Sequence, residues 1–275
     1  MRLTTKIVLS IILAIFILSI GFIIGFSFTD RKDYKNTYSD NQINIPQIKI
    51  TEVEVQPFKT ILIEKEPETK HFNMYIGGTV HLHPVTDAST PNTISLPEEV
   101  LQYSDIKSLG DTLRIMIKVK DVYSNYNTDS SERTFYSVSG LNFHIPTSSN
   151  IDVVCRMNEI ATEIKDIKTN NVKISTNGKV LIDSCNINIL SPMMNGGRQG
   201  FIVKNSKVNE LNIDLDYTKT WNVENSEITT LNLTGSNKNE IQLRKSEIKR
   251  ANWKPKNKEA RLQVTLFGDS ATVVF

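Results

Sequence analysis

This sequence of 275 residues contains few cysteines and few histidines, and its net charge is small. Its two cysteines exclude a disulfide-dense scaffold and a four-cysteine zinc site. The formal net charge is +2, and because Arg2 and Lys6 account for it, the chain from Asp30 onward is neutral. Phosphate binding requires an excess of Lys and Arg. This balance excludes a generally basic nucleic-acid binder, and we expect no nucleic acid among the partners.

Nucleotide-binding and nucleophile motifs are absent as well. The sequence has no P-loop, no G-x-G-x-x-G and no G-x-S-x-G, and no histidine follows His144. We therefore expect no catalytic residues, no cofactor and no metal. Hydrophobic residues make up 39% and charged residues 23%, which indicates a globular chain rather than a disordered one.

One long hydrophobic run lies near the N-terminus. Residues 7–29 carry no charge, and the stretch Ile7–Ile24 is interrupted only by two serines and one glycine. A helix of about 18 to 22 residues is about 27 to 33 Å long, enough to cross the hydrocarbon core. A cleaved signal peptide is the alternative, but its apolar region is usually about 7 to 15 residues long and ends in small residues. We favour an uncleaved transmembrane helix, with residues 7–28 in the lipid bilayer.

Four segments are expected in all. Residues 1–29 form the N-terminal transmembrane anchor, and residues 30–42, which contain no aliphatic side chain, form a polar tether. Residues 43–150 form a β-rich first part of the body, and residues 151–275 form β-solenoid repeats. Long domains are exported largely regardless of flanking charge. We therefore expect a single-pass protein whose body stands outside the cytoplasm.

From Ile43 onward, apolar residues recur at every second position. The clearest run is Leu113-Arg-Ile115-Met-Ile117-Lys-Val119, and shorter ones are Ile48-x-Ile50, Val53-x-Val55 and Ile61-x-Ile63. A period of two predicts half-buried strands. Leu96–Tyr103 is the best candidate for a short helix, so the predicted fold class is all-β.

Three stretches in the last third of the chain repeat one another. They begin at Phe201, Trp221 and Ile241, and they superpose without a gap at this constant spacing. Their shared columns are Val203/Val223/Leu243, Ser206/Ser226/Ser246, Val208/Ile228/Ile248 and Asn212/Asn232/Asn252. A weaker copy, Ile182–Leu190, precedes the first repeat with an offset of 21 residues rather than 20. It places Cys185 in the serine column. A regular period of this length predicts a stacked array.

Each repeat has room for two short strands but not for an ordinary helix. It predicts one coil of a parallel β-solenoid, with about 20 residues per coil and coils about 4.8 Å apart. The valine and isoleucine columns would then form a continuous core, and the asparagine column a hydrogen-bonded ladder. A leucine-rich repeat is the alternative, since Val208-x-x-Leu211-x-Ile213 fits its opening, but Asp216 stands where that repeat has asparagine.

Three motifs precede the repeats in a fixed order. A Phe-x-x-Ile strand begins at Phe58, a middle strand follows at Gly110–Ile115, and a third strand, Leu141–Pro146, ends in proline. In this order the chain resembles a family of bacterial envelope proteins, the auto-transporter adhesins with a head GIN domain, over about residues 50 to 267. The resemblance implies an adhesin-like protein built on short solenoid repeats, and it supplies no catalytic residues.

Two groups of titratable side chains need a chemical interpretation. Asp214 and Asp216 share one face of a predicted strand, as a glycosidase pair would, but a solvated acidic face is the simpler interpretation. His81 and His83 share a strand face with acceptable geometry for a transition metal, although no third ligand is specified. We assign neither group a catalytic or metal-binding role.

Positive charge is concentrated near the end of the chain. Residues 238–261 hold nine Lys and Arg against three Glu. A candidate patch for an anionic glycan or lipid headgroup consists of Lys245, Lys249, Arg250, Trp253 and Lys254. The alternative is a solvated terminal coil, whose lysines would protect the exposed strand edge from further pairing.

These observations predict a non-enzymatic, membrane-anchored protein of the bacterial cell envelope. Its expected role is binding or adhesion, with the lipid bilayer and a polysaccharide or other envelope component as partners. A carbohydrate-active enzyme on a β-helix and a structural scaffold are the alternatives.

Overall fold

The computed structural model describes residues 42–67, 74–85, 93–126, 136–147, 150–195, 200–244 and 248–267. The predicted anchor at residues 7–28 and residues 30–41 of the predicted tether lie outside these ranges. Among the residues described, no helix is both long enough and apolar enough to cross a membrane.

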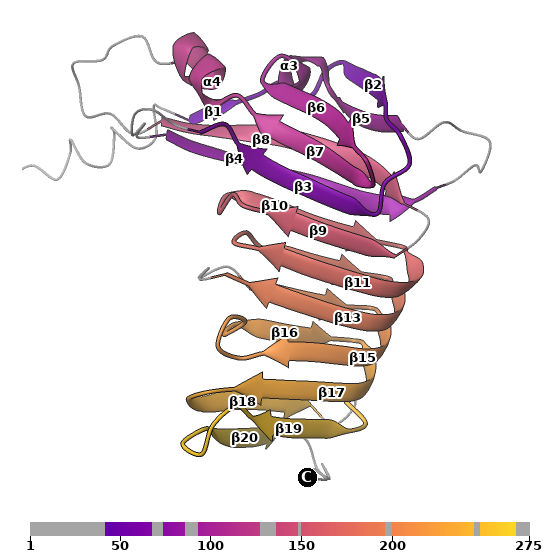
Figure 1. Ribbon diagram of the computed structural model, residues 1–275, viewed down its shortest axis with the longest axis vertical. Helices are drawn as coiled ribbons and strands as arrows, with labels where there is room; N and C mark the ends of the chain where they lie inside the picture. Colours follow the sequence, from indigo (N-terminus) through magenta and orange to yellow (C-terminus); the bar gives the residue numbers. More distant parts are fainter. Residues whose placement is uncertain are drawn as a thin grey trace, which may run out of the picture.

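The described chain is built of strands, with two short helices near one end (Figure 1). The helices are α3 (Glu98–Leu101) and α4 (Val119–Tyr126). The strands are β1 (Gln42–Asn44), β2 (Ile50–Glu54), β3 (Thr60–Lys65), β4 (Met74–Pro84), β5 (Thr93–Pro97), β6 (Ser104–Leu109), β7 (Thr112–Ile117), β8 (Tyr136–Thr147), β9 (Ile151–Cys155), β10 (Ile160–Lys165), β11 (Lys168–Thr176), β12 (Val180–Asp183), β13 (Asn186–Met194), β14 (Phe201–Lys204), β15 (Lys207–Asp214), β16 (Trp221–Glu224), β17 (Glu227–Gly235), β18 (Lys238–Arg244), β19 (Ala251–Pro255) and β20 (Arg261–Phe267).

Two nine-stranded sheets face each other, and the chain alternates between them from β9 to β17. One sheet runs β16-β14-β12-β10-β4-β8-β5-β2, with β1 beside β8, and the other runs β19-β17-β15-β13-β11-β9-β3-β7-β6. All neighbours from β9 to β17 are parallel. We call one strand from each sheet, with the turn between them, a rung; Figure 1 shows the rungs stacked along the long axis. The predicted all-β class is confirmed, and strands on both sides contradict a leucine-rich repeat.

The core lies between the sheets and is made of like residues stacked from rung to rung. One column runs Ile145, Leu82, Ile164, Ile182, Val203 and Val223, all of them buried. A second column, in the other sheet, runs Val172, Leu190, Leu211, Leu231 and Ala251. The predicted alignments of Val203 with Val223 and of Val208 with Ile228 are confirmed.

The third repeat departs from the predicted stacking. Among the described residues β16 is the last strand of its sheet, and β18 pairs with β20 instead, in a parallel sheet of two strands. The prediction that Leu243 aligns with Val223 is therefore wrong, because Leu243 pairs with Leu266 of β20. The partner of β18 is a later strand, β20, which pairs with it along its whole length, from Lys238 to Arg244.

Two local predictions also needed correction. Ile48 lies at a bend and is 88% exposed, so the strand expected at Ile48–Ile50 begins only at Ile50. Val119 is not the end of the preceding strand but the first residue of α4, which the alternating pattern did not reveal. The short helix expected within Leu96–Tyr103 is present as α3.

The turn between the two strands of a rung repeats with the same backbone conformation. Asp166, Ser184, Asn205 and Asn225 all have positive φ, between 47° and 57°, at this turn. Asparagine and aspartate tolerate this left-handed conformation better than most residues, because their short side chains form local hydrogen bonds. The Asn-Ser sequences at Asn205 and Asn225 thus place an asparagine at the left-handed position of the turn in the first two repeats.

The next residue of each turn forms a hydrogen-bonded ladder along the stack. The Cys185 N–H donates to Ser206 Oγ at 2.9 Å, and the Ser206 N–H donates to Ser226 Oγ at 3.0 Å. Each hydroxyl also donates to a carbonyl of its own turn, Ser206 to Lys204 at 2.7 Å and Ser226 to Glu224 at 2.8 Å. The serine column is therefore structural, and its side chains satisfy buried backbone groups.

Cysteine replaces serine in one rung of this ladder. The Cys185 thiol faces the Asp183 carbonyl at 3.2 Å, as the serines face theirs. Burial raises the pKa of the Cys185 thiol to about 11. Burial also raises the pKa of Cys155. Both thiols are free and buried, so they are packing residues rather than a disulfide.

We predict that Ser206→Ala destabilises the protein by about 1–3 kcal/mol, since the buried Cys185 N–H would lose its acceptor. Cys185→Ser is the matched control, because it introduces the residue that the next two rungs use at this position, and it should destabilise the protein less than Ser206→Ala does. Urea unfolding followed by circular dichroism gives both values. Equal stabilities of Ser206→Ala and the parent protein would show that the ladder does not contribute.

Candidate functional site

Strands β11, β13 and β15 each turn a corner, and an asparagine marks it. In each strand two consecutive side chains face outward at this point, so the alternation of buried and exposed residues is interrupted there. The first residue of each outward pair is Asn170, Asn188 or Asn209. Because the rungs are in register, these three side chains stack at one edge of the molecule.

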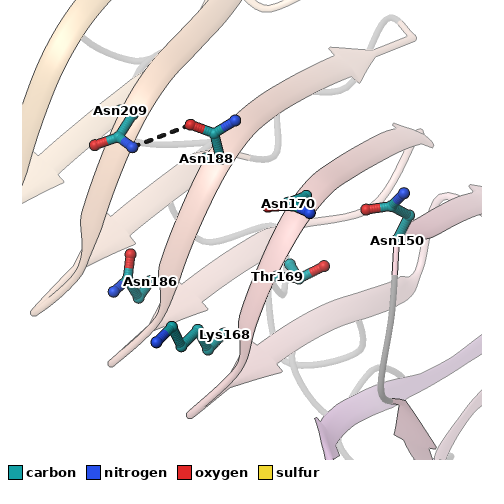
Figure 2. A pocket seen from close by; sticks show the side chains of 7 residues that line it. All are labelled: Asn150, Lys168, Thr169, Asn170, Asn186, Asn188 and Asn209. Atoms are coloured by element: carbon teal, nitrogen blue, oxygen red, sulfur yellow. Dashed lines mark hydrogen bonds between the residues drawn. The ribbon is translucent and has the colours of Figure 1, made fainter.

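The corner lines an open pocket of about 590 Å³ on the outer surface. Figure 2 shows the amides of Asn209, Asn188, Asn170 and Asn150 in a row across neighbouring segments of the stack. We call this site the corner groove. The side chains that line it are Asn150, Lys168, Thr169, Asn170, Asn186, Asn188 and Asn209.

Most of the polar groups in the corner groove are free to bind a ligand. Asn209 donates to Asn188 at 3.0 Å. Within the described part of the chain, the side chains of Asn150, Asn170 and Asn186 make no hydrogen bond, and Lys168 forms no ion pair. Asn150, Asn170 and Asn186 are exposed. Their amides can therefore exchange hydrogen bonds to water for hydrogen bonds to a ligand.

A second asparagine column, Asn212, Asn232 and Asn252, differs from the corner groove because its amides bond to one another. Asn252 donates to Asn232 at 2.8 Å, and Asn232 donates to Asn212 at 2.9 Å. Asn212 in turn donates to the hydroxyl of Ser191 at 3.3 Å. The predicted ladder is confirmed, and its amides are paired along the stack. The corner amides differ because only one such bond joins them.

A second surface pocket, of about 600 Å³, lies over the turn ladder and shares Asn186 with the corner groove. Its side chains are largely committed to the fold. Asn205 donates to Asp183 at 3.0 Å, and Lys207 pairs with Glu227 at 3.5 Å. We therefore take the corner groove, not the turn, as the candidate site.

The structure separates the members of the predicted basic patch. Lys249 pairs with Glu227, while Arg250 and Lys254 are exposed. Trp253 lies on the opposite pleat, in register with the buried Leu233, and packs against the core. Lys245 lies outside the described residues.

The paired carboxylates are held by a lysine. Lys256 Nζ lies 2.5 Å from Asp214 Oδ2 and 2.9 Å from Asp216 Oδ2. Asp216 also accepts from the backbone N–H and hydroxyl of Ser236, at 2.8 and 2.7 Å. The hydrogen bond from Lys256, followed by those from Ser236, lowers the pKa of Asp216 to about 2. A glycosidase acid needs a raised pKa, and the pKa of Asp216 is shifted in the opposite direction.

We predict that Asp216 makes the protein acid-sensitive. Its pKa is lower in the folded protein than in the unfolded chain, so its stabilising effect is present above the unfolded value of 3.8 and is lost as the pH falls toward about 2. Asp216→Asn should therefore lose less stability between pH 5 and pH 2 than the parent does. Urea unfolding at both pH values measures this, with the exposed Asp121→Asn as control. The prediction is contradicted if Asp216→Asn and the parent lose equal stability.

The sequence pattern did not reveal the corner column. Its members are separated by unequal intervals, since the step from Asn170 to Asn188 is shorter than the step from Asn188 to Asn209. Continuing the alignment of the repeats then places Thr229 and Lys249 in the same column. The outward pair at each corner, visible only in the folded chain, was the signal that identified it.

No family model and no curated protein matches the chain. Solved structures with some similarity include a Bacteroides fragilis protein provisionally named an adhesin, with 14% identity, a TM-score of 0.46 and coverage of 82% of this chain and 96% of that one. A Parabacteroides distasonis protein, provisionally named a lipid binding protein, has 12% identity, a TM-score of 0.37 and coverage of 84% and 98%. A Parabacteroides merdae protein, provisionally named an adhesin, has 11% identity, a TM-score of 0.35 and coverage of 85% and 98%. TM-scores below 0.5 do not establish a shared fold, so the function is inferred below from this chain's own residues.

Proposed function

We propose that this chain is a non-enzymatic, membrane-anchored envelope protein that binds a hydroxyl-rich polysaccharide in the corner groove. Its body belongs, on this proposal, to the parallel β-solenoid class. The observation that carries the proposal is the row of amides in the corner groove, in which Asn150 and Asn170 keep unused hydrogen-bonding capacity, with the unpaired amide of Asn186 beside the row. The expected ligand and its orientation follow from the chemistry and position of that row.

The chemistry of the groove suits a sugar chain. Each asparagine amide offers a carbonyl acceptor beside an NH₂ donor, which can pair with neighbouring hydroxyl groups in either direction. The seven residues that line the groove include no aromatic and no aliphatic side chain apart from the stem of Lys168. A small apolar ligand would need an enclosed hydrophobic pocket, which this lining does not provide.

The shape of the groove favours an extended ligand. The amides come from successive rungs, about 4.8 Å apart, and they lie in a row along the stack (Figure 2). Strands position such groups more firmly than loops do, because their backbone is fixed by pairing on both sides. A linear polysaccharide lying along the stack would meet one amide after another.

The enzyme alternative is less well supported. The lining of the corner groove contains no carboxylate and no imidazole. The one carboxylate pair that the sequence pointed to, Asp214 and Asp216, is occupied by Lys256. Hydrolysis would require one acid with a raised pKa, and the hydrogen bonds from Lys256 and Ser236 lower the pKa of Asp216 instead.

To test binding, the full-length protein in detergent would be screened on a glycan array, and its affinity for the best-binding polysaccharide then measured by biolayer interferometry. The double variant Asn170→Ala/Asn188→Ala should bind about tenfold more weakly, since two hydrogen bonds of about 0.5–1.5 kcal/mol each are lost. Asn158→Ala is the control, because Asn158 is exposed and lies outside the groove. No glycan bound, or equal affinities for both variants, would contradict the proposal.

The anchored position is proposed from the sequence alone. Residues 7–28 would cross the bilayer, residues 30–41 would act as a tether that ends where β1 begins at Gln42, and the groove would face the envelope. We therefore expect the mature protein to keep its N-terminal hydrophobic segment and to resist extraction by alkaline carbonate. Mass spectrometry that finds a mature N-terminus near Ser27 would replace the anchor by a cleaved signal peptide.

A further inference from the structure

We propose that the polysaccharide bound in the corner groove is acidic and that Lys168 binds one of its carboxylate groups. This inference rests on the proposed function and adds the charge of the ligand to it. Lys168 is the only charged residue among the seven that line the groove. Within the described part of the chain it forms no ion pair, so a carboxylate of the ligand would not have to displace an internal partner.

The register explains why this lysine has no acidic partner beside it. The column of β11, β13, β15 and β17 that contains it runs Lys168, Asn186, Lys207 and Glu227. Glu227 lies beside Lys207 and pairs with it at 3.5 Å. Lys168 lies beside Asn186, which is neutral. The two lysines occupy equivalent positions in the stack, but Glu227 neutralises only Lys207 of the two.

The acids close to the groove in sequence do not belong to its lining. Those within three positions of a lining residue are Asp152, Asp166, Asp183 and Glu210. Asp183 pairs with Lys204 at 3.3 Å, and Glu210 accepts a hydrogen bond from Asn232 at 3.1 Å. The charge that a ligand meets inside the groove is therefore the positive charge of Lys168.

Lys168 and the amide row can contact the same sugar unit. Lys168 and Asn170 are both exposed, and they lie two positions apart on β11. Residues two apart along a strand point to the same face and lie about 7 Å apart. Figure 2 shows Lys168 and Asn186 beside the row of amides. A uronic acid carries its carboxylate on the same ring as its hydroxyl groups, so it can pair with the lysine while its hydroxyls bond to the amides.

The charge should add a modest preference rather than most of the affinity. Lys168 is exposed, and ion pairs between exposed groups contribute little. We therefore expect an acidic polysaccharide to bind about two- to fivefold more tightly than the same chain without its charge. This preference should disappear at about 1 M salt, where the screening length is about 3 Å, while hydrogen bonding to the amides remains.

The test compares acidic polysaccharides with their own neutral forms. Hyaluronan, polygalacturonate and alginate would each be measured before and after reduction of the carboxylates to primary alcohols. Binding to the full-length protein in detergent would be followed by biolayer interferometry at about 0.15 M salt. At least one acidic polymer should bind about two- to fivefold more tightly than its reduced form. Lys168→Met, which removes the charge and keeps an apolar stem, should bind both forms with the same affinity.

Two further variants serve as controls. Lys173→Met removes an exposed lysine from the same strand outside the groove lining, so it should keep the parent's preference for the acidic form. Asn170→Ala/Asn188→Ala should weaken binding of the acidic and the reduced form alike, because both forms need the amides. Thermal unfolding checks that each variant is folded.

The outcomes separate this inference from the proposed function. Equal affinity of the parent for the acidic and the reduced form of every polymer that binds overturns the inference and leaves the proposed function in place. Binding of none of these polymers overturns the inference, while the glycan array decides the proposed function. A preference that persists in Lys168→Met, or that is lost in Lys173→Met, also overturns it, because charge elsewhere on the surface would then attract the ligand.

Discussion

Parallel pairing in a fixed register is the constraint on which the rest of this structure depends. The register places each residue over the equivalent residue of the next rung, so one choice of side chain is repeated along the stack. Because side chains alternate across a strand, a slip of one residue would exchange the buried and exposed sets. The core column that includes Val203 and Val223 would then face water.

Register also determines whether a polar side chain is structural or available. In the turns, the backbone N–H of Ser206 bonds to the hydroxyl of Ser226, and on the flat face amide hydrogen bonds join Asn252, Asn232 and Asn212. These side chains therefore already have partners within the fold. At the corner the strand changes direction, and only Asn188 and Asn209 remain joined. The amides that are left over, together with Lys168, are what the proposed polysaccharide would contact. The same principle applies to Asp214 and Asp216, whose carboxylates are already taken by Lys256.

The sequence predicted the repeating part of the fold well, because its period appears directly in the residues. The alignments of Val203 with Val223, of Val208 with Ile228 and of Asn212 with Asn232 were identified correctly from spacing alone. The pairing of β18 with β20 was not predictable, because it depends on a later segment, Arg261–Phe267, that lies outside the repeat. The corner groove was missed for a related reason, since unequal rung lengths shift Asn170, Asn188 and Asn209 out of a constant period.

Disulfide trapping tests the register most directly. Ile202 and Asn222 are outward-facing partners on β14 and β16, and partners in such a ladder have Cα atoms about 4.8 Å apart, within the range that a disulfide spans. In Ile202→Cys/Asn222→Cys, mild oxidation should produce a crosslink between the two peptides, detected by mass spectrometry. In Ile202→Cys/Glu224→Cys, the second cysteine faces the same side but is displaced by two residues, about 8 Å from the first, which is too far to bridge. The account predicts a crosslink in the first variant and none in the second, and preferential crosslinking in the second would contradict it.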